Sequence, residues 1–275
     1  MSERRGLQAG ACLLAVALGI GLLGCGERAQ EGERGPVLLH VPCVISAPMV
    51  QVAAAYMKSH PGVEIRTETE KPLALLAEAG SEGAAGSAII TMGDREMEWL
   101  VSAGAVEAAD VRTIAINTYP LAVIAAAEGA PGADELSDLA GPAVKRIYIE
   151  DPARSSLGDR AVQALQQLGL WDDVAAKVVR PDPNAMVLGE VIAGKADAAV
   201  IFEDCIFAEG STGRSVPKTL RVIGRISADT HSPIPYQAAV LSGAEQPEAA
   251  RAFVEFLATP SGREALKKAG LEPAG

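Results

Sequence analysis

The sequence predicts an α/β protein whose sheets are mainly parallel, and three observations support this prediction. Apolar runs typical of buried strands alternate with helix-like segments almost to the end of the chain. Hydrophobic residues make up 49% of the 275 residues, which is enough for a large core. Glycine, proline or serine marks most changes from strand to helix. Such alternation is typical of parallel sheets covered by helices.

The expected strands are short apolar or alternating runs that end at polar or turn-forming residues. Valine, isoleucine and alanine dominate them, and most are too short to be helices. The runs cover residues 37–41, 63–68, 87–92, 113–117, 119–127, 145–151, 176–180, 196–202 and 233–243.

The expected helices begin at capping residues and end at glycine. Ser46 is expected to cap a helix that buries Met49 and Tyr56 on one face, and Asp94 to cap the next. Ser155 and Ser156 are expected to open a later helix. The remaining expected helices cover residues 72–80, 134–141, 184–193, 247–258 and 261–269.

The N-terminus has the layout of a secretory signal. Arg4 and Arg5 precede an apolar run, residues 9–23, that is too short to span a bilayer comfortably. The sequence LLGCG then resembles a bacterial lipobox, so we expect a signal peptide over 1–24 and lipid attachment at Cys25. Residues 25–36 read as a polar tether. An uncleaved N-terminal anchor is the alternative, and both place the body outside the cytoplasm.

The protein is acidic, and its negative charge argues against nucleic acid and bare anionic lipid as partners. The formal net charge is −11, and removal of residues 1–24 makes it −12 because this segment carries two arginines and one glutamate. An acidic body is a poor ligand for nucleic acid or for a bare anionic lipid surface. We therefore expect contact with the membrane only through the lipid anchor.

Several stretches, taken in order, carry a family resemblance. From residue 37 to 271 the chain resembles the type II periplasmic solute-binding proteins of ABC importers, and among them the molybdate-binding class. The resemblance rests on the first strand, turn and helix and on segments 90–106, 149–171, 187–204 and 247–271.

The resemblance implies a two-lobed fold with the ligand in a cleft between the lobes. We expect lobe 1 to comprise residues 37–118 and 237–275, and lobe 2 residues 119–236. The hinge is expected near residues 117–120 and 232–236, where prolines limit the backbone. A small molecule or ion, delivered by a monomer to an ABC permease, is the implied ligand, and no cofactor is expected.

Candidate ligand-binding residues lie where strands end and helices begin, because helix N-termini offer N–H groups to an anion. Hydroxyl groups there can also be ordinary helix caps. The sequence departs from the molybdate-binding pattern at its late strand, where Phe202 replaces a tyrosine and acids follow. The candidates are Cys43, Ser46, Met92, Ser155, Ser156, Cys205 and His231.

Two cysteines remain after the signal peptide and Cys25 are set aside. Cys43 and Cys205 each follow a predicted strand. They are expected to be small core residues, a disulfide, or thiol ligands of a soft metal ion or metalloid, with His231 as a further metal ligand. The third interpretation is the sharpest, and it predicts that both cysteines face the cleft.

The function expected is therefore lipid-anchored capture of a small solute, either an oxyanion such as molybdate or a soft metal or metalloid species, for an ABC importer. A ligand sensor built on the same fold is the alternative. A periplasmic hydrolase is a weaker candidate, because no G-x-S-x-G, H-E-x-x-H or C-x-x-C motif occurs. We therefore do not expect this protein to be an enzyme.

Overall fold

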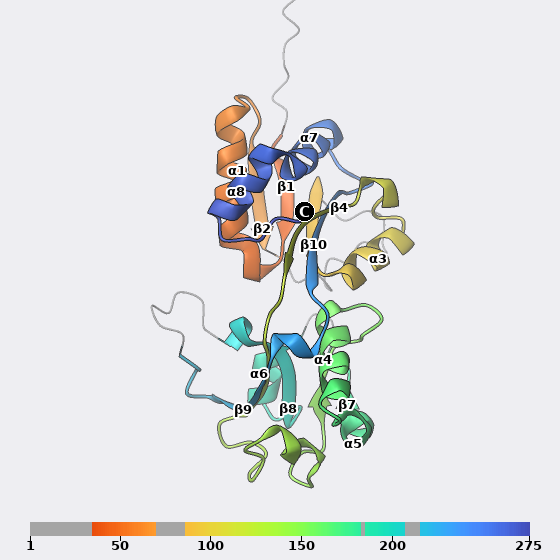
Figure 1. The fold of residues 1–275 in the computed structure, drawn as a ribbon, viewed down its shortest axis with the longest axis vertical. Coiled ribbons are helices and arrows are strands. Elements are labelled where there is room, and N and C mark those ends of the chain that lie inside the picture. The colour runs from red at the N-terminus through yellow and green to blue at the C-terminus, as the bar shows by residue number, and fades with distance from the viewer. Residues whose placement is uncertain (1–34, 70–85, 183–184, 207–214) are drawn as a thin grey trace, which may run out of the picture. The chain divides into compact units, whose positions relative to one another are not determined.

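The computed structural model describes residues 35–69, 86–182, 185–206 and 215–275, and its described strands form two five-stranded sheets (Figure 1). The first sheet has the order β2-β1-β3-β10-β4. Its strands are β1 (Val37–Val41), β2 (Ile65–Thr69), β3 (Ala88–Met92), β4 (Arg112–Asn117) and β10 (Ile234–Val240).

The second sheet is built from the middle of the chain and has the order β7-β6-β8-β5-β9. Two of its members, β6 and β7, are only two residues long. Its strands are β5 (Leu121–Ala126), β6 (Ile147–Tyr148), β7 (Val178–Val179), β8 (Ala198–Phe202) and β9 (Leu220–Ile226).

Helices cover each sheet. The first sheet is contacted by α1 (Ser46–Ser59), α3 (Asp94–Ser102) and α7 (Pro247–Ala258), and α8 (Pro260–Lys268) packs on α1 and α7. On the second sheet lie α4 (Ser156–Gln167) and α6 (Val187–Ile192), with α5 (Trp171–Val174) against α4. The helices are drawn over their sheets in Figure 1.

The core lies between the sheets and these helices. Strands β3 and β8 are buried along their whole length, which explains why their residues are apolar apart from Thr91 of β3. Helix α1 buries Met49, Val52, Ala53 and Tyr56, as its spacing predicts. Each large side chain buried in this way stabilises the fold by about 1.5–3 kcal/mol.

The expectation of an α/β fold is confirmed, but the expectation of mainly parallel sheets is wrong. In each sheet two neighbouring pairs are parallel and two are antiparallel. The antiparallel pairs involve β10 in the first sheet and β5 in the second. These two strands follow the segments 227–233 and 118–120 that connect the sheets, so the mixture arises where the chain crosses over.

Several local expectations also need correction. Ser46 does not cap α1, because a 3₁₀ turn, η1 (Cys43–Ile45), precedes the helix and Ile45 takes the cap position. Asp94 is the first residue of α3, and Gly93 is its cap. Strand β9 was not expected. The expected helix at 72–80 lies outside the described residues.

The predicted lobe boundaries stay a prediction. Each sheet draws on the part of the chain assigned to one lobe, except that β10 of the first sheet begins at Ile234, three residues before the predicted boundary at 237. One hydrophobic cluster includes buried residues from both sheets. Among the described residues, none of the helices combines the length and apolar character needed to cross a bilayer.

Candidate functional site

The candidate site is built around two cysteines, each in a 3₁₀ turn that follows a strand of one of the two sheets. Cys43 opens η1 directly after β1, and Cys205 lies in the 3₁₀ turn η5 (Glu203–Ile206) directly after β8. The neighbouring Cys43 side chain, followed by burial, raises the pKa of the Cys205 thiol. Cys43 is exposed and Cys205 is half-buried. The structure thus places Cys43 close enough to Cys205 to affect the pKa of its thiol, although the two residues are 162 positions apart in the sequence.

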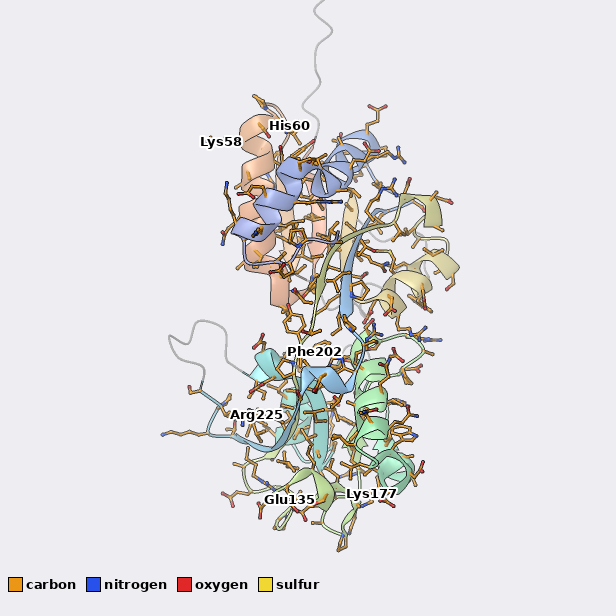
Figure 2. All side chains as sticks on the ribbon, in the orientation of Figure 1. Lys58, His60, Glu135, Lys177, Phe202 and Arg225 are labelled. Atoms are coloured by element: carbon orange, nitrogen blue, oxygen red, sulfur yellow. The ribbon has the colours of Figure 1, made fainter. Side chains whose placement is uncertain are left out.

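Three aromatic side chains, Tyr119, Phe202 and Tyr236, form a cluster at the end of β8. Phe202, which is labelled in Figure 2, is the last residue of β8. Its ring centroid lies 5.9 Å from that of Tyr119. The Tyr119 and Tyr236 hydroxyl oxygens are 2.6 Å apart, and the Asn117 amide donates to Tyr119 at 3.1 Å. Burial, followed by the neighbouring Tyr119, raises the pKa of Tyr236. Cys205 makes the smallest of the contributions that raise the pKa of Tyr236.

Two hydroxyl groups lie near Cys43. Ser46 is the first residue of α1, and its Oγ is 2.8 Å from the Oγ1 of Thr69 at the end of β2. The parallel pairing of β1 with β2 ends at Val41 and Thr69, so both hydroxyls lie at the carboxyl end of these two strands. This is the edge at which parallel strands present ligand-binding groups.

The start of α4 is occupied by carboxylates of the chain itself. Ser155 caps the helix by accepting from the Gly158 N–H at 3.2 Å, and its hydroxyl donates to Glu150. Ser156 donates to Glu96 twice, from its N–H at 2.8 Å and from its Oγ at 2.5 Å. The N–H and hydroxyl groups of Ser156, which a helix N-terminus could offer to an anion, are therefore directed at Glu96 in this structure.

Glu96 belongs to α3, so its contact with Ser156 joins helices on the two sheets. Burial raises the pKa of Glu96 to about 7, while the Ser156 hydrogen bonds lower it and nearby Glu150 raises it. The side chain is only 5% exposed. Glu96 is thus a carboxyl group that changes charge close to neutral pH while buried between two helices.

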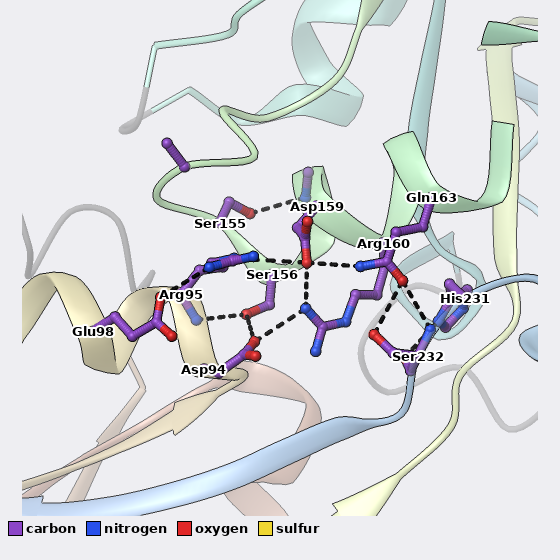
Figure 3. A network of polar contacts seen from close by, with 12 residues as sticks. Asp94, Arg95, Glu98, Ser155, Ser156, Asp159, Arg160, Gln163, His231 and Ser232 are labelled. Carbon is purple, nitrogen blue, oxygen red and sulfur yellow. Dashed lines mark hydrogen bonds and ion pairs between the residues drawn. The ribbon is translucent and has the colours of Figure 1, made fainter. Parts of the chain in front are cut away.

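Charged side chains surround the same contact (Figure 3). The Arg160 guanidinium, buried to 3% exposure, lies 3.0 Å from Asp94 and donates to Asp159 at 2.5 Å and to the Pro233 carbonyl at 3.0 Å. Arg95 lies 3.7 Å from Asp159. The network links α3, α4 and the segment that leads into β10.

Gly93 permits the close approach of α3 and α4. Its φ is 129°, which disfavours other residues, and a Cβ at this position would lie 1.8 Å from the Ser156 Oγ. Any side chain at position 93 would therefore separate Ser156 from Glu96.

Met92 and His231 do not join the thiols in a metal site. Met92 is buried in the core beside Tyr236 in the strand pairing. His231 places its Nε2 2.9 Å from the Tyr119 carbonyl and its Nδ1 2.9 Å from the Ser232 carbonyl. Within the part of the chain that the structure describes, no three His, Cys, Asp or Glu side chains are arranged to hold a metal ion.

A surface pocket of about 490 Å³ lies between α4 and the 3₁₀ turn η6 (Ala228–Thr230). His231 and Ser232 line it together with three glutamines of α4, and neither Cys43 nor Cys205 does. Tyr119, Phe202 and Tyr236 do not line this pocket either. We therefore place the candidate site beside the two cysteines rather than here.

Sequence reasoning missed Glu96, Glu150, Tyr119 and Tyr236. A signal for Glu96 was present, because it precedes Met97 on the buried stripe of α3 and follows the cap glycine by three positions. The tyrosines carry no such signal, since their hydroxyl contact joins residues 117 positions apart.

Comparisons with known proteins agree with this architecture. A family model described as Bacterial extracellular solute-binding protein matches residues 39–272. The molybdate-binding protein ModA of Azotobacter vinelandii is 26% identical over 261 residues, which are 94% of this chain and 96% of that protein. YvgL of Bacillus subtilis (strain 168), named as an ABC transporter substrate-binding lipoprotein, is 25% identical over 220 residues, or 80% of each chain.

Two solved structures show the same fold. The periplasmic molybdate-binding protein of Azotobacter vinelandii matches with a TM-score of 0.57 at 20% identity, over 87% of this chain and 100% of that chain. The sulfate-binding protein SubI of Mycobacterium tuberculosis H37Rv matches with a TM-score of 0.60 at 17% identity, over 87% of each chain.

The resemblance seen in the sequence is thereby confirmed, and so is the expectation of a binding protein rather than an enzyme. The family match spans most of the chain and both sheets. The chain belongs to the bacterial extracellular solute-binding proteins and has the type II periplasmic binding protein fold.

Proposed function

We propose that this chain is the lipid-anchored solute-binding subunit of an ABC importer, and that its solute is a small inorganic oxo species of the kind that molybdate represents. The names of the relatives support this proposal: ModA proteins bind molybdate, and YvgL is named as an ABC transporter lipoprotein. The permease and a lipid-bearing membrane are then the partners. The chain acts as a monomer, with the solute as its ligand and no cofactor.

The positions of Cys43 and Cys205 carry the proposal. One cysteine follows a strand of the first sheet and the other follows a strand of the second, and Cys43 is near enough to Cys205 to raise the pKa of its thiol, which supports a convergence of the strand ends of both sheets. Ligands of α/β proteins bind at such strand ends. Cys43, Ser46 and Cys205 are therefore proposed to contact the solute.

The other predicted residues have supporting roles in this proposal. Ser155 and Ser156 fix the start of α4 through Glu150 and Glu96. Met92 packs in the core, and His231 contacts the Tyr119 carbonyl, so that the two segments that connect the sheets are linked to each other. The lobes, 37–118 with 237–275 and 119–236, are proposed to close on the solute by bending in the two connecting segments.

The lipid anchor at Cys25 lies outside the described residues. It is supported by the lipobox-like sequence and by the lipoprotein name of YvgL. Attachment there leaves the proposed tether, residues 25–36, between the membrane and the folded body, which suits delivery to a permease in the same membrane.

Elemental analysis of the full chain, purified in detergent without added ligand, tests the function. We expect a bound inorganic species at up to one equivalent per chain, and calorimetric titration with molybdate, tungstate and sulfate measures which oxo species exchanges with it. Ser46→Ala should weaken binding, whereas Ser59→Ala, at the other end of α1, should not. If no inorganic oxo species binds or co-purifies, the proposed solute class is wrong.

A further inference from the structure

We infer that the hydroxyl group of Tyr119 donates a hydrogen bond to the solute, so that the solute atom it contacts is an acceptor oxygen, as in an oxyanion of the molybdate type. The inference rests on the proposed function, because it adds a residue to that same site and specifies the chemistry of the contacted atom. Tyr119 is not among the candidate ligand-binding residues found from the sequence.

Tyr119 lies between strand ends of the two sheets. It stands shortly before β5, whose first residue, Leu121, pairs with Phe202, the last residue of β8. The rings of Tyr119 and Phe202 have centroids 5.9 Å apart. The Tyr119 hydroxyl oxygen is 2.6 Å from that of Tyr236, which pairs with Met92, the last residue of β3. One side chain thus reaches the carboxyl ends of β3 and β8, and ligands of α/β proteins bind at such ends.

Within the part of the chain that the structure describes, the hydrogen bonds around Tyr119 leave its own hydroxyl hydrogen without an acceptor. Tyr236 is fully buried, and burial raises its pKa, so its hydroxyl keeps its hydrogen. If Tyr119 donated to Tyr236, this buried hydrogen would lose its acceptor among the described residues, at a cost in free energy. Tyr236 is therefore the donor. The Asn117 amide donates to the same Tyr119 oxygen at 3.1 Å.

This arrangement makes Tyr119 a donor toward any further partner. Its oxygen already accepts two hydrogen bonds, so the hydrogen is what it can still offer. Hydrogen bonds in a chain polarise one another, which strengthens that donor. Tyr119 is half-buried and Tyr236 is fully buried, so Tyr119 is the tyrosine that a solute can reach. An oxo oxygen can accept this hydrogen, whereas a bare cation cannot.

Other uncharged donors lie along the same edge of the first sheet. Strands β2, β1 and β3 are neighbours and run parallel, so their carboxyl ends share one edge. The hydroxyl groups of Ser46 and Thr69 lie at the ends of β1 and β2, and Tyr119 reaches the end of β3 through Tyr236. Hydrogen bonds from such donors to an anion are roughly twice as strong as those between neutral groups.

Substitution of the two tyrosines separates a contact with the solute from a structural role, because Tyr119→Phe and Tyr236→Phe break the same hydrogen bond. Calorimetric titration of the full chain in detergent with molybdate, tungstate and sulfate measures the affinity. For each oxyanion that binds the parent, Tyr119→Phe should lower the affinity by about 10- to 100-fold, as expected for a hydrogen bond to an anion. Tyr236→Phe is the matched control and should lower it by less than about threefold, because Tyr119 keeps its hydrogen and Asn117 still donates to its oxygen.

A double variant keeps the test independent of how well Tyr119→Phe folds. That single variant leaves the Tyr236 hydroxyl buried without its acceptor, which lowers the stability. Combining Tyr119→Phe with Tyr236→Phe removes this hydroxyl as well. The double variant should therefore recover most of the stability in urea unfolding and still bind the oxyanion as weakly as Tyr119→Phe does.

The outcomes distinguish this inference from the proposed function. If molybdate, tungstate and sulfate all fail to bind the parent, both are wrong. If one of them binds the parent and Tyr119→Phe equally well, the proposed function stands and this inference alone fails. Equal losses of affinity in Tyr119→Phe and Tyr236→Phe would also overturn it, because the pair would then shape the site without contacting the solute.

Discussion

Glu96 offers a sharp test of the contact between α3 and α4, because its pKa is raised from 4.5 to about 7 by burial between the helices. In the unfolded chain this carboxyl group ionises near 4.5, so between these values the folded protein binds a proton that the unfolded chain has lost. The stabilising contribution is complete below about pH 4.5 and is lost as the pH rises through about 7.

The magnitude follows from the shift. One pKa unit corresponds to about 1.4 kcal/mol, so between about pH 5 and about pH 8 the free energy of unfolding should fall by about 2 to 3 kcal/mol on account of Glu96. Glu96→Gln cannot titrate and should lack this loss. The difference in stability between the variant and the parent should therefore move by the same amount in favour of the variant.

Urea unfolding of both proteins at the two pH values measures this difference. Glu98→Gln, on the exposed side of the same helix and paired with Arg95 at 3.0 Å, is the matched control and should keep the pH dependence of the parent. If the difference between Glu96→Gln and the parent is the same at both pH values, Glu96 is not buried against Ser156 in solution, and the proposed joining of the sheets through this contact fails.

Three further predictions concern other parts of the chain. Gly93→Ala should cost about 1–3 kcal/mol of stability because its Cβ would overlap the Ser156 hydroxyl; Gly104→Ala, also at positive φ but with open space around it, should cost only about 1 kcal/mol, and equal urea midpoints would contradict the steric argument. Arg160→Met should cost about 2 kcal/mol, because it removes the cation between carboxylates that are themselves partly exposed, and thermal unfolding that matches the parent would be evidence against this role. Cys25→Ser should release the protein from membranes or block its maturation, as cell fractionation would show; a variant that stays membrane-bound and is processed as before would refute the lipid anchor.

The local elements were largely predictable from the sequence, because each depends on neighbouring residues. Apolar runs gave β1, β3 and β8, and the end residues of α7 were correctly expected at Pro247 and Ala258. The caps at Ser46 and Asp94 were wrong because a 3₁₀ turn and a glycine with positive φ moved the helix starts by a residue. Capping preferences are small free energies that local backbone geometry can override.

The direction of the strands was decided by the path of the chain between the sheets. β10 has an apolar sequence that fits either orientation, and it is antiparallel because it enters the first sheet from the second. Periodicity reports which side chains are buried and says nothing about the direction of a strand relative to its neighbours.

The sequence by itself determined the secretory layout, the acidic charge, the α/β class and the presence of two cysteines after strands. Only the tertiary structure decided that Cys43 lies near enough to Cys205 to raise the pKa of its thiol, that Ser156 donates to Glu96, and that the carbonyls of Tyr119 and Ser232 face the ring of His231. The reason is physical: hydrophobic patterns and caps act over a few neighbouring residues, whereas these contacts join segments that are brought together only when both sheets have formed.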